Sequence, residues 1–94
     1  MQIERILLAI KIDQQTHMIA VRSDYTAGEL YRYVLNAFDG VLKYILDYEI
    51  AMLYKGQNLM LAPNTQLRHV LPVAVRSTIE MCPMPQEIYV NEHP

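Results

Sequence analysis

The chain is poor in the residues that most cofactor sites need. Its 94 residues include one cysteine, three glycines and no tryptophan. The single cysteine, Cys82, cannot close an internal disulfide, nor can it alone hold an iron–sulfur cluster or a structural zinc, which indicates a reducing, cytoplasmic setting. Three glycines cannot build a glycine-rich phosphate-binding loop. The three histidines are far apart in the sequence, so we expect no metal and no cofactor.

The chain also lacks a surplus of positive charge and a long apolar run. Ten acidic and eight basic residues give a net charge of −2, whereas nucleic-acid binding needs a clustered basic face, so we expect no nucleic-acid partner. No stretch approaches the roughly 20 apolar residues of a membrane span, and residues 1–5 show no secretory signal. With 52% hydrophobic and 19% charged residues, the composition is typical of one small folded domain.

Alternating apolar residues predict two strands near the N-terminus. Residues 6, 8, 10 and 12 are all large aliphatic residues, which predicts a strand over residues 5–12 with one buried face. The polar residues 13–16 are typical of a hairpin loop. Residues 17–22 then form the return strand, with Ile19 and Val21 facing inward.

A helix over about residues 27–38 is predicted by its cap and its apolar face. Thr26 followed three residues later by Glu29 has the spacing of a capping box. Leu30, Val34 and Phe38 recur at helical spacing. Asp39 and Gly40 supply a C-terminal stop, because glycine readily adopts the left-handed conformation. Residues 41–48 are mainly apolar and favour either further helical turns or a strand.

The second half of the chain alternates short strands with turns. We expect strands over residues 50–54, 59–61 and 77–81, a turn over residues 55–58 and a single helical turn over residues 67–71. The composition changes at Cys82, after which three prolines favour an extended tail. We therefore expect a domain over residues 1–82 and a tail over residues 83–94. The predicted core comprises Ile6, Leu8, Ile10, Ile19, Val21, Leu30, Val34, Phe38, Met52, Leu67 and Ile79.

This order of elements resembles the ubiquitin-like β-grasp fold. Residues 23–30 (SDYTAGEL) are similar to the entry of that family's long helix, and residues 52–59 (MLYKGQNL) to its hydrophobic strand, glycine turn and following leucine. Residues 65–67 and 77–81 are similar to its closing segment. The resemblance covers about residues 3–82. It implies an α+β fold in which a mixed sheet of four to five strands packs on one main helix.

The resemblance also implies a recognition patch on the outer face of the sheet. Carried over position by position, this patch uses Leu53, Glu80 and Cys82, with Gln14 near the hairpin. Only Leu53 keeps the apolar character of the family, which has an aliphatic residue at the hairpin and a histidine where Glu80 stands. We therefore expect contacts that differ from the family's standard ones.

Two further segments are candidate partner-binding regions. Five large apolar residues lie between residues 41 and 46, Leu42 and Tyr44 among them, and exposed apolar patches often mark partner sites. Alternatively, this segment lengthens the helix and covers the open end of the core. In the tail, Ile88, Tyr89 and Val90 form an alternating piece that could add a strand to an exposed sheet edge.

No combination of residues predicts catalysis. A catalytic thiol needs a base and a pocket, and Cys82 is better explained as a small, semi-buried hydrophobic side chain. We expect a non-enzymatic ubiquitin-like protein that acts through protein–protein contacts, self-association included, and that resembles divergent bacterial members of the group. The alternatives are a small accessory subunit of a multicomponent enzyme and a covalent modifier with an unusual C-terminus.

One departure from the family generates a prediction about conjugation. Ubiquitin-type modifiers carry a diglycine shortly after the last strand, whereas residues 82–88 contain no glycine. We expect the 94-residue chain to form no thioester with a ubiquitin-activating enzyme, because bulky side chains occupy the stretch that the enzyme threads. The measurement is a non-reducing gel of the activation reaction, with ubiquitin as the positive control. A reducible adduct of the unprocessed chain would contradict the prediction.

Overall fold

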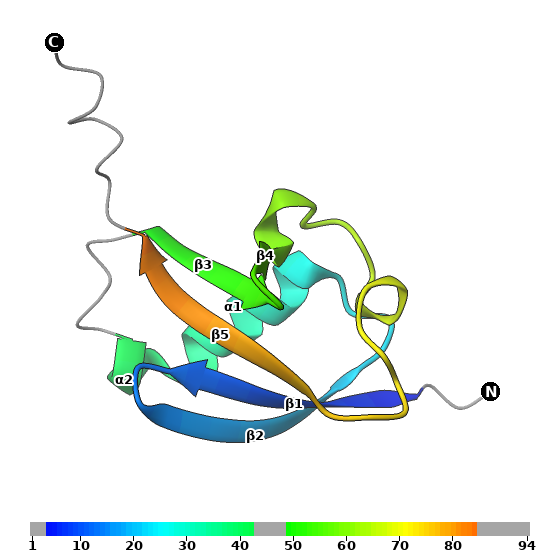
Figure 1. Cartoon of the computed structure of the whole chain (residues 1–94), viewed down its shortest axis with the longest axis horizontal. Helices are drawn as coiled ribbons and strands as arrows, with labels where there is room; N and C mark the ends of the chain where they lie inside the picture. Colours follow the sequence, from blue (N-terminus) through cyan, green and yellow to red (C-terminus); the bar gives the residue numbers. More distant parts are fainter. Residues whose placement is uncertain (1–3, 43–48, 85–94) are drawn as a thin grey trace, which may run out of the picture.

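A five-stranded sheet packs against one main helix in the computed structural model, which describes residues 4–42 and 49–84 (Figure 1). The strands are β1 (Arg5–Ile12), β2 (Gln15–Arg22), β3 (Glu49–Tyr54), β4 (Gln57–Asn58) and β5 (Ser77–Met84). The helices are α1 (Ala27–Ala37) and the short α2 (Asp39–Leu42), and two 3₁₀ turns, η2 (Leu59–Leu61) and η3 (Leu67–His69), follow β4.

The sheet is mixed, with its first and last strands side by side at the centre. The strand order is β2-β1-β5-β3-β4, in which β1 and β5 run parallel and the other neighbours run antiparallel. Ile10 lies opposite Ile79, and Met52 lies opposite Met81. Helix α1 covers one face of this sheet, behind it in the view of Figure 1. The predicted α+β class and mixed sheet are confirmed.

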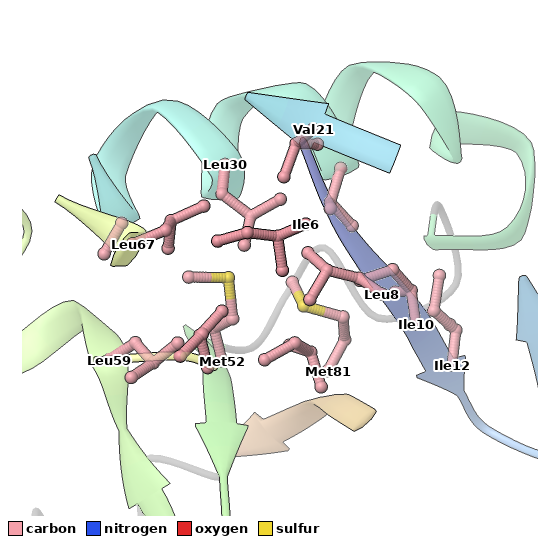
Figure 2. Packing of buried hydrophobic residues seen from close by; sticks show 14 of the residues in the cluster. Ile6, Leu8, Ile10, Ile12, Val21, Leu30, Met52, Leu59, Leu67 and Met81 are labelled. Carbon is pink, nitrogen blue, oxygen red and sulfur yellow. The ribbon is translucent and has the colours of Figure 1, made fainter. Parts of the chain in front are cut away.

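The core lies between the sheet and α1, where inward side chains of β1, β3 and β5 meet the apolar face of the helix (Figure 2). Among the predicted core residues, the two exceptions are Ile19 and Phe38, which are only half-buried and pack at the margin of the core. Ile19 is on the outermost strand and Phe38 is the C-cap of α1, so neither is enclosed on all sides. The predicted residues that are buried are Ile6, Leu8, Ile10, Val21, Leu30, Val34, Met52, Leu67 and Ile79.

The start of α1 has the predicted capping box. The Glu29 amide donates to Thr26 Oγ1 at 3.1 Å, and the Thr26 amide donates to Glu29 Oε1 at 2.9 Å. The next two amides of the helix are satisfied from elsewhere in the chain, since Ala27 donates to the Thr65 carbonyl and Gly28 to the Pro63 carbonyl. The first turn of the helix is therefore tied to the segment between η2 and η3.

Four local expectations are wrong. Residues 15 and 16 belong to β2 and residues 57 and 58 to β4, so the two hairpin turns consist only of residues 13–14 and 55–56. Gly40 does not adopt the left-handed conformation. Instead, α1 closes at Phe38, whose amide donates to the Val34 carbonyl, and Gly40 lies inside α2. Residues 59–61 form η2 and not a strand, because Asn58 Oδ1 accepts the Met60 amide at 3.1 Å and turns the chain into a 3₁₀ helix.

The last strand, β5, continues to Met84, three residues beyond its expected end at residue 81. For residues 41–48, the helical alternative holds at Val41 and Leu42, the end of α2, and residues 43–48 lie outside the described part of the chain. The division into a domain of residues 1–82 and a tail of residues 83–94 stays a prediction.

The burial of the helix face predicts the effect of two truncations. Leu30→Ala and Val34→Ala should each lower the free energy of unfolding by about 1–4 kcal/mol, since both side chains are fully buried and each change removes packed atoms and leaves a cavity. Chemical denaturation with matched m-values measures this. Leu61→Ala is the control, because Leu61 is 84% exposed and its truncation should cost less than about 0.5 kcal/mol. Equal stability of all three variants would show that the helix face is wrongly assigned.

Candidate functional site

The outer face of the sheet carries the residues predicted for recognition. Leu53 on β3 lies directly opposite Glu80 on β5, and Glu80 is in turn the neighbour of Lys11 on β1. Opposite residues share a face, so these three side chains form one row across the sheet. Cys82 follows on the same face of β5, half-buried, opposite Ala51. The structure thus places Leu53, Glu80 and Cys82 on one surface.

The other predicted site residues are not part of this row. Gln14 is exposed in the turn between β1 and β2, beyond the last register pair of the hairpin. Leu42 ends α2, and its side chain is outside the description. Tyr44, Ile88, Tyr89 and Val90 all lie outside the described residues, so their contribution to partner binding stays a prediction.

A hollow of about 490 Å³ is lined by all three residues of the Leu53–Glu80–Lys11 row. It lies between the β3–β4 hairpin and the loop of residues 72–76 that leads into β5. Apolar atoms come from Leu53, Pro72 and Val75, of which Val75 is 60% exposed. We call this hollow the basic groove, because its charged lining consists of Lys11, Lys55 and Arg76 with Glu80 as the one carboxylate.

Local backbone geometry positions both walls of the basic groove. The β3–β4 connection uses Lys55 at φ 50° and Gly56 at φ 81°, the pair of positive φ values of a two-residue hairpin that matches the twist of its strands. Lys55 Nζ then lies 5.5 Å from the centre of the Tyr54 ring, within cation–π range. On the opposite wall, buried Leu71 and Ser77 anchor the two ends of the loop, which leaves Val75 turned toward solvent.

A second hollow, of about 620 Å³, lies on the other side of the β3–β4 hairpin. It is mainly apolar, with Leu59, Leu61, Ala62 and Val70 in its lining. Leu53 and Gly56 line both hollows, so the hairpin is the wall between them. Of the residues that line the two hollows, sequence reasoning identified Leu53 and Glu80. It missed Val75 and Arg76, because residues 72–76 have no periodic pattern and are brought to the site by the register of β5 against β1 and β3.

The described residues offer no arrangement typical of metal or thiol chemistry. No group of three His, Cys, Asp or Glu side chains within residues 4–42 and 49–84 could hold a metal ion. The Cys82 thiol has the Pro83 carbonyl at 3.8 Å as its hydrogen-bond acceptor, and a carbonyl is not a base that could activate it. No helix in the described ranges is long and apolar enough to span a membrane.

The closest ion pair among the described residues is away from the groove, where β2 ends. Arg22 donates to both carboxylate oxygens of Asp24, at 3.0 and 2.9 Å. The hydrogen bond and the positive charge of Arg22 lower the pKa of Asp24, and the same contact raises the pKa of Arg22. The pair is exposed and screened by solvent, so it mainly fixes the turn and contributes little stability.

Comparison with solved structures identifies the fold. The UBL domain of yeast Ddi1 is 16% identical and superposes with a TM-score of 0.57, covering 86% of this chain and 93% of that chain. A solved Arabidopsis thaliana protein, At2g32350, is 13% identical with a TM-score of 0.55, covering 88% of this chain and 90% of that one. No family model and no curated protein matches the sequence. The predicted ubiquitin-like β-grasp fold is therefore confirmed.

The backbone conformations of Gly56, in the β3–β4 turn, and Gly40, in α2, predict different effects of substitution by alanine. A methyl group at Gly56 or Gly40 meets no atom within 4 Å, but only Gly56 has a positive φ. Gly56→Ala should destabilise the protein by about 1 kcal/mol through backbone strain alone. Gly40→Ala, in helix α2, should be neutral or stabilising by up to about 1 kcal/mol. Thermal and urea unfolding measure both, and a shared sign would contradict the assigned backbone conformations.

Proposed function

We propose that this chain is a non-enzymatic ubiquitin-like protein that binds another protein through the outer face of its sheet. The observation that carries the proposal is the basic groove, where an exposed apolar side chain, Val75, lies among three cationic ones. An apolar contact provides affinity and flanking charges orient the partner. This combination supports a protein partner whose binding segment has an apolar residue next to acidic residues.

The charge balance of the groove supports an acidic partner over a basic one. Lys11, Lys55 and Arg76 face a single carboxylate, Glu80, although the whole chain is net acidic. A local excess of positive charge on an acidic protein raises the local concentration of acidic ligands. It is too small for the clustered basic face of a nucleic-acid binder, and we place the interaction in the cytoplasm because the chain has a single cysteine.

The alternatives differ in what the bound protein would be. An accessory subunit of a multicomponent enzyme would use the same surface to dock on its larger partner. A covalent modifier would require processing to uncover a C-terminal glycine, and residues 77–88 contain no glycine. Binding without conjugation is therefore the function that we propose, whichever class of protein is the partner.

The test compares two substitutions of exposed apolar residues by aspartate, one in the basic groove and one in the second hollow. The tagged full-length chain, Val75→Asp and Leu61→Asp are used to capture proteins, which are identified by mass spectrometry. Val75 lines the basic groove, and Leu61, even more exposed, lines the second hollow. We expect Val75→Asp to lose the partner and Leu61→Asp to retain it, with unchanged thermal unfolding in both.

Once a partner is known, charge reversal tests the electrostatic part. Arg76→Glu should weaken its binding by about tenfold, or 1.4 kcal/mol, at low salt and by less at high salt, because exposed charges are screened. Capture of the same proteins by wild type and Val75→Asp, or binding that does not respond to Arg76→Glu, would refute the groove as the binding site.

A further inference from the structure

The outermost strand of the sheet, β2, has an open edge of unusual character. Within the described residues no element lies outside β2, which forms the lower rim of the sheet in Figure 1. Its eight residues contain no lysine, no acidic residue and no proline, and Arg22 at its end is the only charged residue. Proteins normally protect a long edge with such residues, because unpaired backbone groups pair with other strands. The opposite edge, β4, is only two residues long.

Hydrogen bonding in the β1–β2 ladder shows which residues of β2 face outward. The Ser23 amide donates to the Glu4 carbonyl at 2.8 Å, and these two residues continue the register in which Arg22 lies opposite Arg5. Hydrogen-bonded and non-hydrogen-bonded pairs alternate in an antiparallel ladder. Residues 17, 19 and 21 therefore bond to β1, whereas the amide and carbonyl of Thr16, Met18 and Ala20 point away from the sheet.

The edge ends at Arg22. Its carbonyl accepts the Tyr25 amide at 3.1 Å, and its guanidinium is bound to Asp24. Among the described residues of this edge, those with both the amide and the carbonyl unpaired are thus three residues centred on Met18. Such a set is its own complement under a two-fold axis, because reversing residues 16, 18 and 20 places Thr16 opposite Ala20 and Met18 opposite itself.

We propose that the chain forms a two-fold dimer in which the β2 edges of two copies pair antiparallel, with Met18 opposite Met18 of the second copy. Three residue pairs, each exchanging two backbone hydrogen bonds, would join the two sheets into one. The basic groove is a separate surface, lined mainly by β3, β5, the hairpin and the loop of residues 72–76, although Lys11 on β1, opposite Thr16, also lines it.

The side chains on both faces of the edge support a second copy as the occupant. On the outer face Met18 and its neighbour Leu7 are each 54% exposed, and pairing would bring the two Met18 side chains together. On the inner face half-buried His17, with its ring centre 4.5 Å from that of Phe38, would stand opposite half-buried Ile19 of the second copy. Residues 15–21 include no Lys, Arg, Asp or Glu, so two identical edges bring no such like charges together.

Disulfide cross-linking tests the register. In a full-length Cys82→Ser background, Met18→Cys should form a covalent dimer on mild oxidation, because opposite residues of a hydrogen-bonded pair have Cα atoms about 5.5 Å apart, within disulfide range. Ala20→Cys is the matched control on the same edge and face. In the proposed register it lies opposite Thr16 of the second copy, so it should give little covalent dimer.

Light scattering over a concentration series tests the edge itself. Met18→Lys places two ammonium groups opposite each other and should weaken dimerisation by about tenfold or more. Leu7→Lys changes a side chain of equal exposure on β1, one strand from the edge, and should leave the dimer largely intact. Circular dichroism should show an unchanged fold for both variants.

Several outcomes would overturn the dimer proposal. One is a wild-type protein that is monomeric at every concentration, together with a Met18→Cys variant that forms no cross-link. A dimer that Leu7→Lys disrupts as strongly as Met18→Lys would place the contact on the sheet face. A dimer lost in full-length Ile88→Asp with Val90→Asp, but kept in Met18→Lys, would assign the contact to the C-terminal segment. None of these results would affect the capture experiment on the basic groove, so the two proposals fail separately.

Discussion

The parallel pairing of β1 with β5 is the constraint on which the rest of this structure depends. It places the first and last strands of the described chain side by side at the centre of the sheet. Every other strand is then added outward, β2 beyond β1 and β3 with β4 beyond β5. The inward residues of the central pair, such as Ile10 and Ile79, are fully buried, and α1 has to cross this face to enclose them.

The two sides of the central pair have different chemical characters. Beyond β5, the β3–β4 hairpin and the loop of residues 72–76 form the walls of the basic groove, which presents side chains. Beyond β1, β2 presents backbone groups along an uncharged edge. Side-chain surfaces select partners by shape and charge, whereas an open edge selects any compatible strand. The two binding modes that we propose therefore differ in kind, since one uses side chains and the other uses backbone groups.

Local sequence signals predicted the elements that local physics determines. The alternation in β1 located a strand because one face is covered by the core, and Thr26 with Glu29 located the start of α1 because both bonds of the capping box lie within four residues. The errors arose where a distant or side-chain partner decides. Gly40 is compatible with a left-handed stop and with a helix, and the Asn58 side chain, which also accepts the Met52 amide from β3 at 3.2 Å, converts residues 59–61 into a 3₁₀ turn.

The difference between local signals and distant partners also explains why the candidate site was predicted only in part. Leu53 and Glu80 were predicted because a family resemblance supplies the strand register. Arg76 and Val75 were not, because their place beside Lys11 and Lys55 depends on how β5 enters the sheet. The resemblance also carried over positions on the outer face but no information about the β2 edge, whose outward residues follow only from the observed hydrogen-bond alternation.

The central position of β5 has a consequence for folding of this protein during its synthesis on the ribosome. Strand β5 spans Ser77–Met84, so the middle of the sheet is empty until nearly all of the described chain has left the exit tunnel. Before that, the β1–β2 hairpin is a two-stranded unit with both long edges open, and such hairpins are marginal alone. Completion of the domain therefore waits for its last strand, and contacts between residues so far apart in sequence close slowly. A nascent chain stalled before residue 77 would expose Ile6, Leu8 and Ile10 to chaperones, whereas one stalled well beyond residue 84 would bury them.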